Sequence, residues 1–357
     1  MSRNILKSNN SFVGTSLLSD KQAFHTANVN LNLFNLTQTA SFSVDLPHER
    51  LKQLGSNNYA VNDPFTQPDI QLSISYIPNT DLNNEKHNFF RTGERLAPAL
   101  KGAANASTNF YIFNDPNQGE DAFEDLTLSS TLDLNGYEVL AFGNAFLTDY
   151  SVNYEVGGMP LVATSYICSN MKFENATGTS MESVAINLVS GNNTNVGRCN
   201  FNFSNGSKDP TIVRPVGDNQ SSVTMQNLQV GGQVLSGIHL LQSVNLNVSL
   251  PRISSYGLGS DYAYNRKFQS PAQGSFSATS LVSGFSEGDV TGILNNESEY
   301  SFDVIFKSGS KQCFYRVENA KLESYSYSME VNGEMSFDSS FSFPVTEDGG
   351  LLISGKA

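Results

Sequence analysis

Residues 144–168, NAFLTDYSVNYEVGGMPLVATSYIC, return in altered form at residues 319–343, NAKLESYSYSMEVNGEMSFDSSFSF. Aligned without gaps, the two stretches are identical at nine of 25 positions. The identities in the first stretch are Asn144, Ala145, Leu147, Tyr150, Ser151, Glu155, Val156, Gly158 and Ser165. Self-similarity of this length indicates a repeated structural unit.

Each stretch alternates apolar and polar side chains, which is typical of a strand buried on one face. Tyr150, Val152 and Tyr154 alternate with Ser151 and Asn153 in the first stretch. A glycine-containing turn, GGMP in the first and NG in the second, separates this strand from a second one of the same kind. The pattern predicts a β-hairpin in each stretch, in matched register.

Two further pairs of segments support a duplicated domain. Residues 43–68, SVDLPHERLKQLGSNNYAVNDPFTQP, align with residues 247–271, NVSLPRISSYGLGSDYAYNRKFQSP, once one residue is gapped. Residues 110–113, FYIF, align more weakly with residues 303–306, DVIF. The first pair begins with an alternating strand and continues as a loop of about twenty residues, a length that is usually functional.

The expected fold is mainly β: two tandem homologous β-sandwich or barrel domains, each with one short helix. The helix candidates are residues 82–102 in the first domain and 287–296, capped by Ser286, in the second. The expected boundaries are an N-terminal arm (1–35), a first domain (36–175), a connecting segment with short strands (176–232), a second domain (233–345) and a C-terminal arm (346–357).

In order and pattern, these hairpins and the long Gly/Tyr/Pro loops resemble phage tail tube proteins. The resemblance covers both domains and implies stacked rings of six tube domains around a DNA-conducting lumen. Two domains per chain would then give homotrimeric, pseudo-hexameric rings, with tail-tip and tail terminator proteins as further partners. It also implies a place in the virion tail after synthesis in the bacterial cytoplasm.

The resemblance assigns candidate residues to two surfaces. The polar face of the hairpin strands would line the lumen, with an outward solvated face as the alternative: Asp149, Ser151, Asn153, Glu155, Ser324, Ser326, Ser328 and Glu330. The long loops would contact a neighbouring ring: Gly55, Tyr59, Asn62, Phe65, Gly259, Tyr262, Asn265 and Phe268.

The composition agrees with a structural role. Charged residues are only 15% of the chain, and the net charge of −13 disfavours binding of nucleic acid, which needs Lys and Arg. DNA would therefore pass through without specific binding. No stretch has the length or hydropathy of a membrane span, so no membrane partner is expected.

Neither catalysis nor a cofactor is expected. The three cysteines (Cys168, Cys199 and Cys313) and four histidines lack metal-ligand spacing, so no metal is expected. Residues 284–288, GFSEG, fit the nucleophile-elbow pattern, but the last histidine, His239, precedes them, which excludes a triad in the usual order. The alternatives are a tail-tip or baseplate ring protein, such as a distal tail or tube-initiator protein, and a receptor- or carbohydrate-binding β module.

Overall fold

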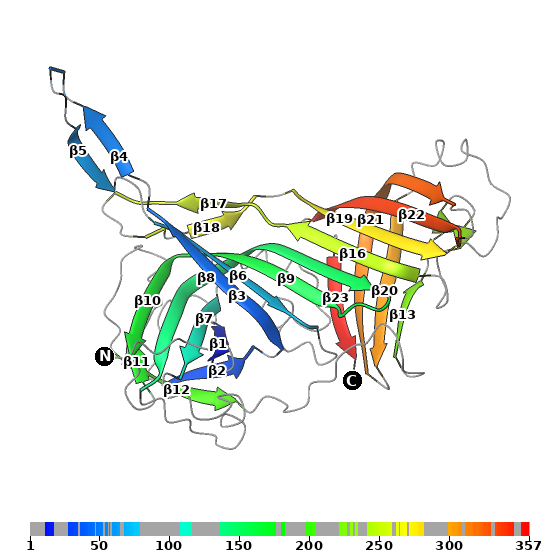
Figure 1. The fold of residues 1–357 in the computed structure, drawn as a ribbon, viewed down its shortest axis with the longest axis horizontal. Coiled ribbons are helices and arrows are strands. Elements are labelled where there is room, and N and C mark those ends of the chain that lie inside the picture. Colours follow the sequence, from blue (N-terminus) through cyan, green and yellow to red (C-terminus); the bar gives the residue numbers. More distant parts are fainter. Residues whose placement is uncertain are drawn as a thin grey trace.

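The computed structural model describes residues 11–17, 28–34, 36–46, 48–52, 54–55, 57, 59–64, 68–78, 108–115, 136–175, 180–182, 198–204, 221–226, 229–230, 233–234, 241–258, 262–263, 265–269, 271–281, 299–308, 311–329, 333–345 and 351–356. Every element in this part of the chain is a β-strand, so the mainly β prediction is confirmed (Figure 1). Both helix candidates and the GFSEG segment lie outside the described residues.

Within the described residues, ten strands belong to the first half of the chain. The first six are β1 (Ser11–Leu17), β2 (Asn28–Leu33), β3 (Thr37–Asp45), β4 (His48–Lys52), β5 (Tyr59–Pro64) and β6 (Asp69–Tyr76). The remaining four are β7 (Thr108–Asn114), β8 (Glu138–Glu155), β9 (Leu161–Cys168) and β10 (Asn170–Asn175).

The rest of the chain continues in the same way. The expected connecting segment holds β11 (Ser180–Glu182), β12 (Arg198–Ser204), β13 (Ser221–Gln226) and β14 (Gln229–Val230). The second half holds β15 (Gln233–Val234), β16 (Leu241–Ser249), β17 (Arg252–Ser255), β18 (Asn265–Phe268), β19 (Ala272–Leu281), β20 (Tyr300–Ser308), β21 (Lys311–Ser328), β22 (Ser336–Val345) and β23 (Leu351–Lys356).

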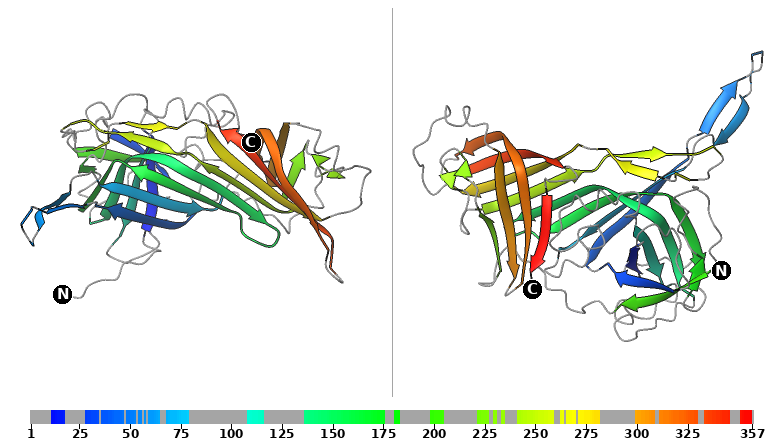
Figure 2. Two further views of the ribbon diagram at one scale, coloured as in Figure 1. Left: turned by 90° about the horizontal axis from the view of Figure 1, so that it is seen from above. Right: turned by 180° about the vertical axis from the view of Figure 1, so that it is seen from behind.

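One long sheet runs through both halves, and we call it the shared sheet. Its strands pair in the order β3–β6–β9–β8–β16–β19–β22–β21, all antiparallel. Two outer sheets cover it: β11–β12–β2–β1–β7–β8–β10 behind the first half and β13–β20–β21–β23 behind the second. Figure 2 shows the shared sheet extending from one outer sheet to the other.

The two long strands, β8 and β21, each belong to the shared sheet and to an outer sheet. Each bends after a residue in the left-handed region, Asn144 at φ 50° and Asn319 at φ 57°, where asparagine is tolerated better than most residues. In β8 the backbone amide of Asn144 donates to Asn109 Oδ1 over 2.8 Å, so the bend leaves no orphaned N–H. A register shift follows in each strand, at Leu147/Asp149 and at Leu322/Ser324.

The strand orders of the two halves match, including their irregularities. β3, β6, β7, β8, β9 and β10 have the same partners among themselves as β16, β19, β20, β21, β22 and β23. The first strand of each set shifts register at equivalent places, Thr37/Thr39 and Leu241/Ser243. A duplication predicts this agreement, and the duplication itself stays a prediction.

The pairings align the third repeated segment differently from the sequence comparison. Phe110 on β7 pairs with Phe142, and Phe302 on β20 pairs with Val317 at the equivalent place on β21. FYIF therefore matches FDVI (302–305), one residue earlier than DVIF. Two short apolar tetrapeptides align equally well by eye in either register, whereas the ladder hydrogen bonds fix one.

Segments expected to be arms or loops form strands. β1 pairs with β7 along its whole length, and β23 pairs with β21, so both expected arms contribute to the outer sheets. The expected long loops contain the hairpins β4–β5 and β17–β18. Two apolar runs of the expected connecting segment, residues 185–189 (AINLV) and 211–216 (TIVRPV), lie outside the described residues.

A single hydrophobic core lies between the shared sheet and the outer sheets. Its buried cluster includes Tyr150 and Val152 from the first half together with Phe276, Tyr315 and Val317 from the second. Full burial of each such side chain stabilises the fold by about 1.5–3 kcal/mol. Because the cluster is continuous, the two halves depend on each other for a complete interior.

Candidate functional site: a polar sheet face with two open edges

The face of the shared sheet that points away from the core carries mostly small polar side chains. One row of paired residues crosses all eight strands: Thr39, Ser75, Ala163, Ser151, Asn247, Ser275, Ser342 and Lys321. Because side chains alternate between faces along a strand, every second residue of each strand joins this surface. We call it the polar face.

Hydroxyl groups on the polar face bond to one another across the strands. Ser73 and Ser165 lie 3.3 Å apart, Thr39 and Ser75 2.6 Å, and Ser324 and Ser340 2.7 Å. Such cross-strand pairs stabilise a sheet modestly. Each such pair uses one O–H donor and one acceptor lone pair, and the remaining groups of the two hydroxyls stay available to solvent.

The structure places the described members of the predicted lumen set on this one face. On β8, Asp149, Asn153 and Glu155 are exposed and Ser151 is half-buried; on β21, Ser324, Ser326 and Ser328 are exposed. The two groups are separated by β16, β19 and β22. Glu330 lies outside the described residues, and that the polar face lines a lumen stays a prediction.

The predicted lumen set covers only two of the eight strands that carry the polar face. Among the residues that it left out, Asn245, Asn247 and Ser249 on β16 and Ser41 and Ser43 on β3 are exposed on the same face. The alternation of these residues with apolar ones indicates a solvent-exposed face, and this signal could have included them in the predicted set. The sequence does not give the strand order that places β16 beside β8 and β3 beside β6.

The halves meet at an internal joint between β8 and β16. Seven residue pairs join the two strands, from Ser243 opposite Glu155 to Ser249 opposite Asp149. On the core side of this joint, apolar residues in and just after β16 are covered: Leu246 is 3% exposed, Val248 0% and Leu250 1%. The joint is therefore as closely packed as any other part of the sheet.

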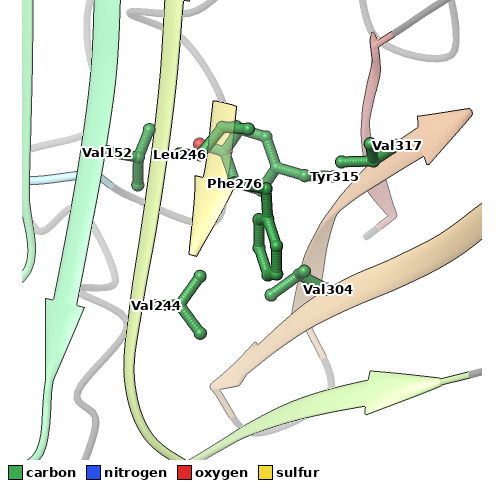
Figure 3. Close-up of a pocket in the computed structure, with 7 residues that line it drawn as sticks. All are labelled: Val152, Val244, Leu246, Phe276, Val304, Tyr315 and Val317. Atoms are coloured by element: carbon green, nitrogen blue, oxygen red, sulfur yellow. The ribbon is translucent and has the colours of Figure 1, made fainter. Parts of the chain in front are cut away.

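Side chains from the second outer sheet close the joint from behind. Figure 3 shows Val152 and Leu246 facing Tyr315 and Val317 around a small apolar pocket. The hydroxyls of Tyr150 and Tyr315 lie 3.0 Å apart, so one hydrogen bond links the halves inside the core. This contact fixes how β8 sits on the outer sheet of the second half.

At the two ends of the shared sheet the same apolar positions are uncovered. On β3, Phe42 is 48% exposed, Val44 38%, and the following Leu46 54%. At the other end, Tyr325 and Tyr327 on β21 are only half-buried and Met329 is 74% exposed. The expectation that both hairpins bury their aromatic face therefore holds for β8 and not for β21. Within the described structure, residues 324–328 of β21 pair with β22 on one side and with no strand on the other.

The hairpin β17–β18 is fixed to the first half by the half-buried Arg252 and the buried Arg266. Arg252 Nε donates to the carbonyl oxygen of Leu147 over 2.7 Å and its guanidinium lies 5.3 Å from the centre of the Phe146 ring. Arg266 Nη2 donates to the carbonyl oxygen of Cys168 over 3.1 Å. Burial lowers the pKa of Arg252 to about 10 and also lowers that of Arg266, with their mutual repulsion adding to the shift of Arg252.

The equivalent hairpin of the first half, β4–β5, extends away from the body of the molecule (Figure 1). Most of the residues predicted to contact a neighbouring ring lie on these hairpins: Gly55 in the β4–β5 turn at φ 85°, Tyr59 and Asn62 on β5, Tyr262 between β17 and β18, and Asn265 and Phe268 on β18. Phe65 and Gly259 lie outside the described residues. The contact with a neighbouring ring stays a prediction.

Among the described residues, no group of three or more His, Cys, Asp or Glu side chains is placed to hold a metal ion. Cys168 is buried with a free thiol whose pKa is raised, chiefly by burial, which makes it a poor nucleophile. Within the same part of the chain, no helix is long and apolar enough to cross a membrane.

No protein-family model and no curated protein matches this sequence. Similar solved structures include a chain from the virion of a native gene transfer agent particle, with 14% identity over 40% of this chain and 100% of that chain, at a TM-score of 0.23. Another comes from the tail of an empty gene transfer agent particle with C6 symmetry, with 16% identity over 38% and 95% of the two chains, at a TM-score of 0.23.

Proposed function

We propose that this chain is a non-catalytic structural protein of a phage tail, the major tube subunit, whose copies close into stacked rings around a DNA-conducting channel. The observation that carries the proposal is the shared sheet, which runs unbroken through both halves and, in the part of the chain that the structure describes, ends in two edges with no further strand beside them. Long uncovered edge strands invite pairing with another chain. Closing the sheet with further copies removes both edges at once.

The matched halves support a particular ring. If each half is one tube domain of a duplicated chain, three chains supply six domains and a pseudo-sixfold ring. The joint between β8 and β16 then repeats between chains, which gives every domain the same surroundings.

The polar face supports the assignment of the channel wall. It carries small hydroxyls with acids such as Asp149 and Glu155, and three chains at −13 bring 3 × −13 = −39 charges to a ring. Like charge keeps a phosphate backbone from adhering to the wall, because nonspecific binding of DNA needs Lys or Arg to displace counterions.

Electron microscopy of the purified full-length chain tests the proposal. Rings or tubes with a central hole are expected, together with a copy number per virion high enough for many stacked rings. A protein that stays monomeric at high concentration would overturn it. A copy number that corresponds to one ring per virion would instead identify a tail-tip ring protein.

The charge of the wall can be tested separately by replacing Glu155 with lysine. Tubes of the Glu155→Lys variant are expected to assemble but to eject DNA several-fold more slowly, and the defect should shrink at high salt because screening weakens the attraction. Glu155→Gln, which removes the charge without reversing it, is the matched control and should change the rate little. Equal ejection rates for all three proteins would contradict a wall formed by the polar face.

A further inference from the structure

We infer that the two open edges of the shared sheet are partners: residues 324–329 in and just after β21 pair antiparallel with residues 40–45 of β3 in a second copy of this chain, in the register that β8 and β16 adopt within one chain. This inference rests on the proposed function and names the contact that would close its ring.

The register comes from the internal joint. β16 corresponds to β3 through NVSLP (247–251) and SVDLP (43–47), and β8 corresponds to β21 through the hairpin stretches. Asn247 faces Ser151 and Val248 faces Tyr150 in the joint. Transferring the observed pairs gives Ala40 with Met329, Ser41 with Ser328, Phe42 with Tyr327, Ser43 with Ser326, Val44 with Tyr325, and Asp45 with Ser324.

Burial at equivalent positions supports this pairing. Phe42, Val44 and Leu46 are 48%, 38% and 54% exposed, whereas their counterparts Leu246, Val248 and Leu250 are 3%, 0% and 1% exposed. On the other edge, Met329 is 74% exposed and its counterpart Tyr154 only 3%. The two edges thus leave uncovered the same apolar positions that the internal joint covers.

The edge strands also lack the features that prevent pairing. Natural edge strands are commonly protected by charges, lysine above all, or by proline. β3 reads TQTASFSVD and residues 324–328 of β21 read SYSYS, with Asp45 the one charged residue in either. Both edges are therefore free of local obstacles to a further strand.

On the core side of the proposed contact, the first half offers an apolar surface on which the tyrosines of a second copy can pack. In the internal joint, Tyr150 packs on Tyr315 of the adjoining outer sheet. The equivalent outer-sheet position in the first half is Leu140, next to Phe142, on which the Phe42 ring already rests at 5.5 Å between ring centres. Tyr325 and Tyr327 of a second copy would cover Leu140 and Phe42, which are partly exposed in the single chain.

The contact is directional because its two edges differ. A β3 edge meets a β21 edge, and neither meets its own kind, so the interface is heterologous. Repeating a heterologous contact produces a closed ring when the rotation closes and an open filament when it does not. If only one kind of edge paired with its own kind, assembly would instead stop at a dimer.

The hydrogen bonds of the internal joint identify the best positions for cross-linking. Val156 N donates to Gln242 O and Leu250 N donates to Thr148 O, at 2.9 Å and 2.6 Å. Pairs on the opposite face, such as Asn247 with Ser151, are therefore the non-hydrogen-bonded pairs, whose Cα atoms lie about 4.5 Å apart. That separation suits a disulfide, and Ser43 with Ser326 is the transferred equivalent.

The experiment is oxidation of the full chain carrying Ser43→Cys and Ser326→Cys, followed by non-reducing electrophoresis. A ladder of covalent multimers is expected. Ser41→Cys with Ser326→Cys has the same surface and cysteine count but is two residues out of register, and its cross-linking should be weaker by at least about tenfold. Asn247→Cys with Ser151→Cys should form an intrachain disulfide without multimers, which confirms the geometry.

Single variants make the test independent of the double substitution. A mixture of Ser43→Cys and Ser326→Cys chains should yield covalent dimers, and neither chain should yield them alone. Dimers from one single variant alone would overturn the inference in favour of like-edge pairing.

The outcomes also separate this inference from the proposed function. Rings or tubes seen by microscopy without the Ser43–Ser326 link, or with the offset link preferred, overturn the register and leave the tail-tube proposal standing. Absence of both rings and links overturns the two together.

Discussion

The two halves of the chain have the same strand order, yet they fill equivalent parts of the core with different side chains. In the first half Ile70 lies opposite Cys168, a large residue facing a small one. In the second half Gly274 lies opposite Phe343, with the sizes reversed. A Cβ atom on Gly274 would come within 2.2 Å of the Phe343 ring, so the ring occupies the space that a side chain there would need. A core tolerates such exchanges when the total volume is kept.

The two halves differ more in which strands lie beside their first shared-sheet strand than in the alternation of apolar and polar residues along it. β16 and β3 carry the same alternation, but β16 lies between two strands and β3 lies at an edge. Burial follows the neighbours and not the sequence pattern. The sequence of a strand therefore determines which of its side chains share a face, and the position of the strand in the sheet determines whether that face is buried.

The largest effect is expected from substitutions in the Gly274–Phe343 pair of the second half. Phe343→Cys should lower the free energy of unfolding by about 3–5 kcal/mol because it leaves a cavity beside Gly274. Gly274→Ile should also destabilise the fold, because its side chain meets the Phe343 ring. Combining the two recreates the pair of the first half and should restore most of the loss, as measured by urea unfolding of the full chain. Losses that simply add would show that the two positions do not share one space.

A second variant pair tests how position determines burial. Leu246→Ala should cost the unassembled chain about 2–5 kcal/mol, because Leu246 is buried in the internal joint. The matched Phe42→Ala should cost clearly less there, since the ring is half exposed, but it should reduce assembly several-fold. Unfolding curves and sedimentation of the same samples give both quantities. Equal losses of stability would contradict the difference between joint and edge.

The smallest effect concerns the hydrogen bond between the halves. Tyr150→Phe removes the hydroxyl that meets Tyr315 and should lower the free energy of unfolding by about 1 kcal/mol. Tyr325→Phe, at the equivalent edge position, is the control and should leave the unassembled chain unchanged. Thermal denaturation of the three proteins is sufficient to detect the difference. A larger effect at Tyr325 would reverse the assignment of joint and edge.

Sequence reasoning could predict the hairpin strands and their faces because a period of two is a local property. Tyr150 and Val152 point into the core and Asn153 points out, as their alternation predicts. The GGMP turn also follows the prediction, with Gly157 at a φ of 79°. These features depend on a few neighbouring residues.

What could not be predicted depends on partners far along the chain. The alternation of Phe42 and Val44 identifies an apolar face, but it cannot tell whether another sheet covers that face. The parallel pairing of β2 with β12 joins segments whose sequences give no sign of each other. The anchoring of Arg252 on the carbonyl oxygen of Leu147 likewise has no local signature.

The continuous core also has a consequence for synthesis on the ribosome. Tyr150 and Val152 emerge during translation well before Tyr315 and Val317, the residues that cover them. The apolar side chains of the first half that the second outer sheet covers therefore stay exposed until the last strands have been synthesised. A chain arrested between β10 and β20 would present this apolar surface to other nascent chains, which makes the interval before β21 emerges the one in which chaperones matter most.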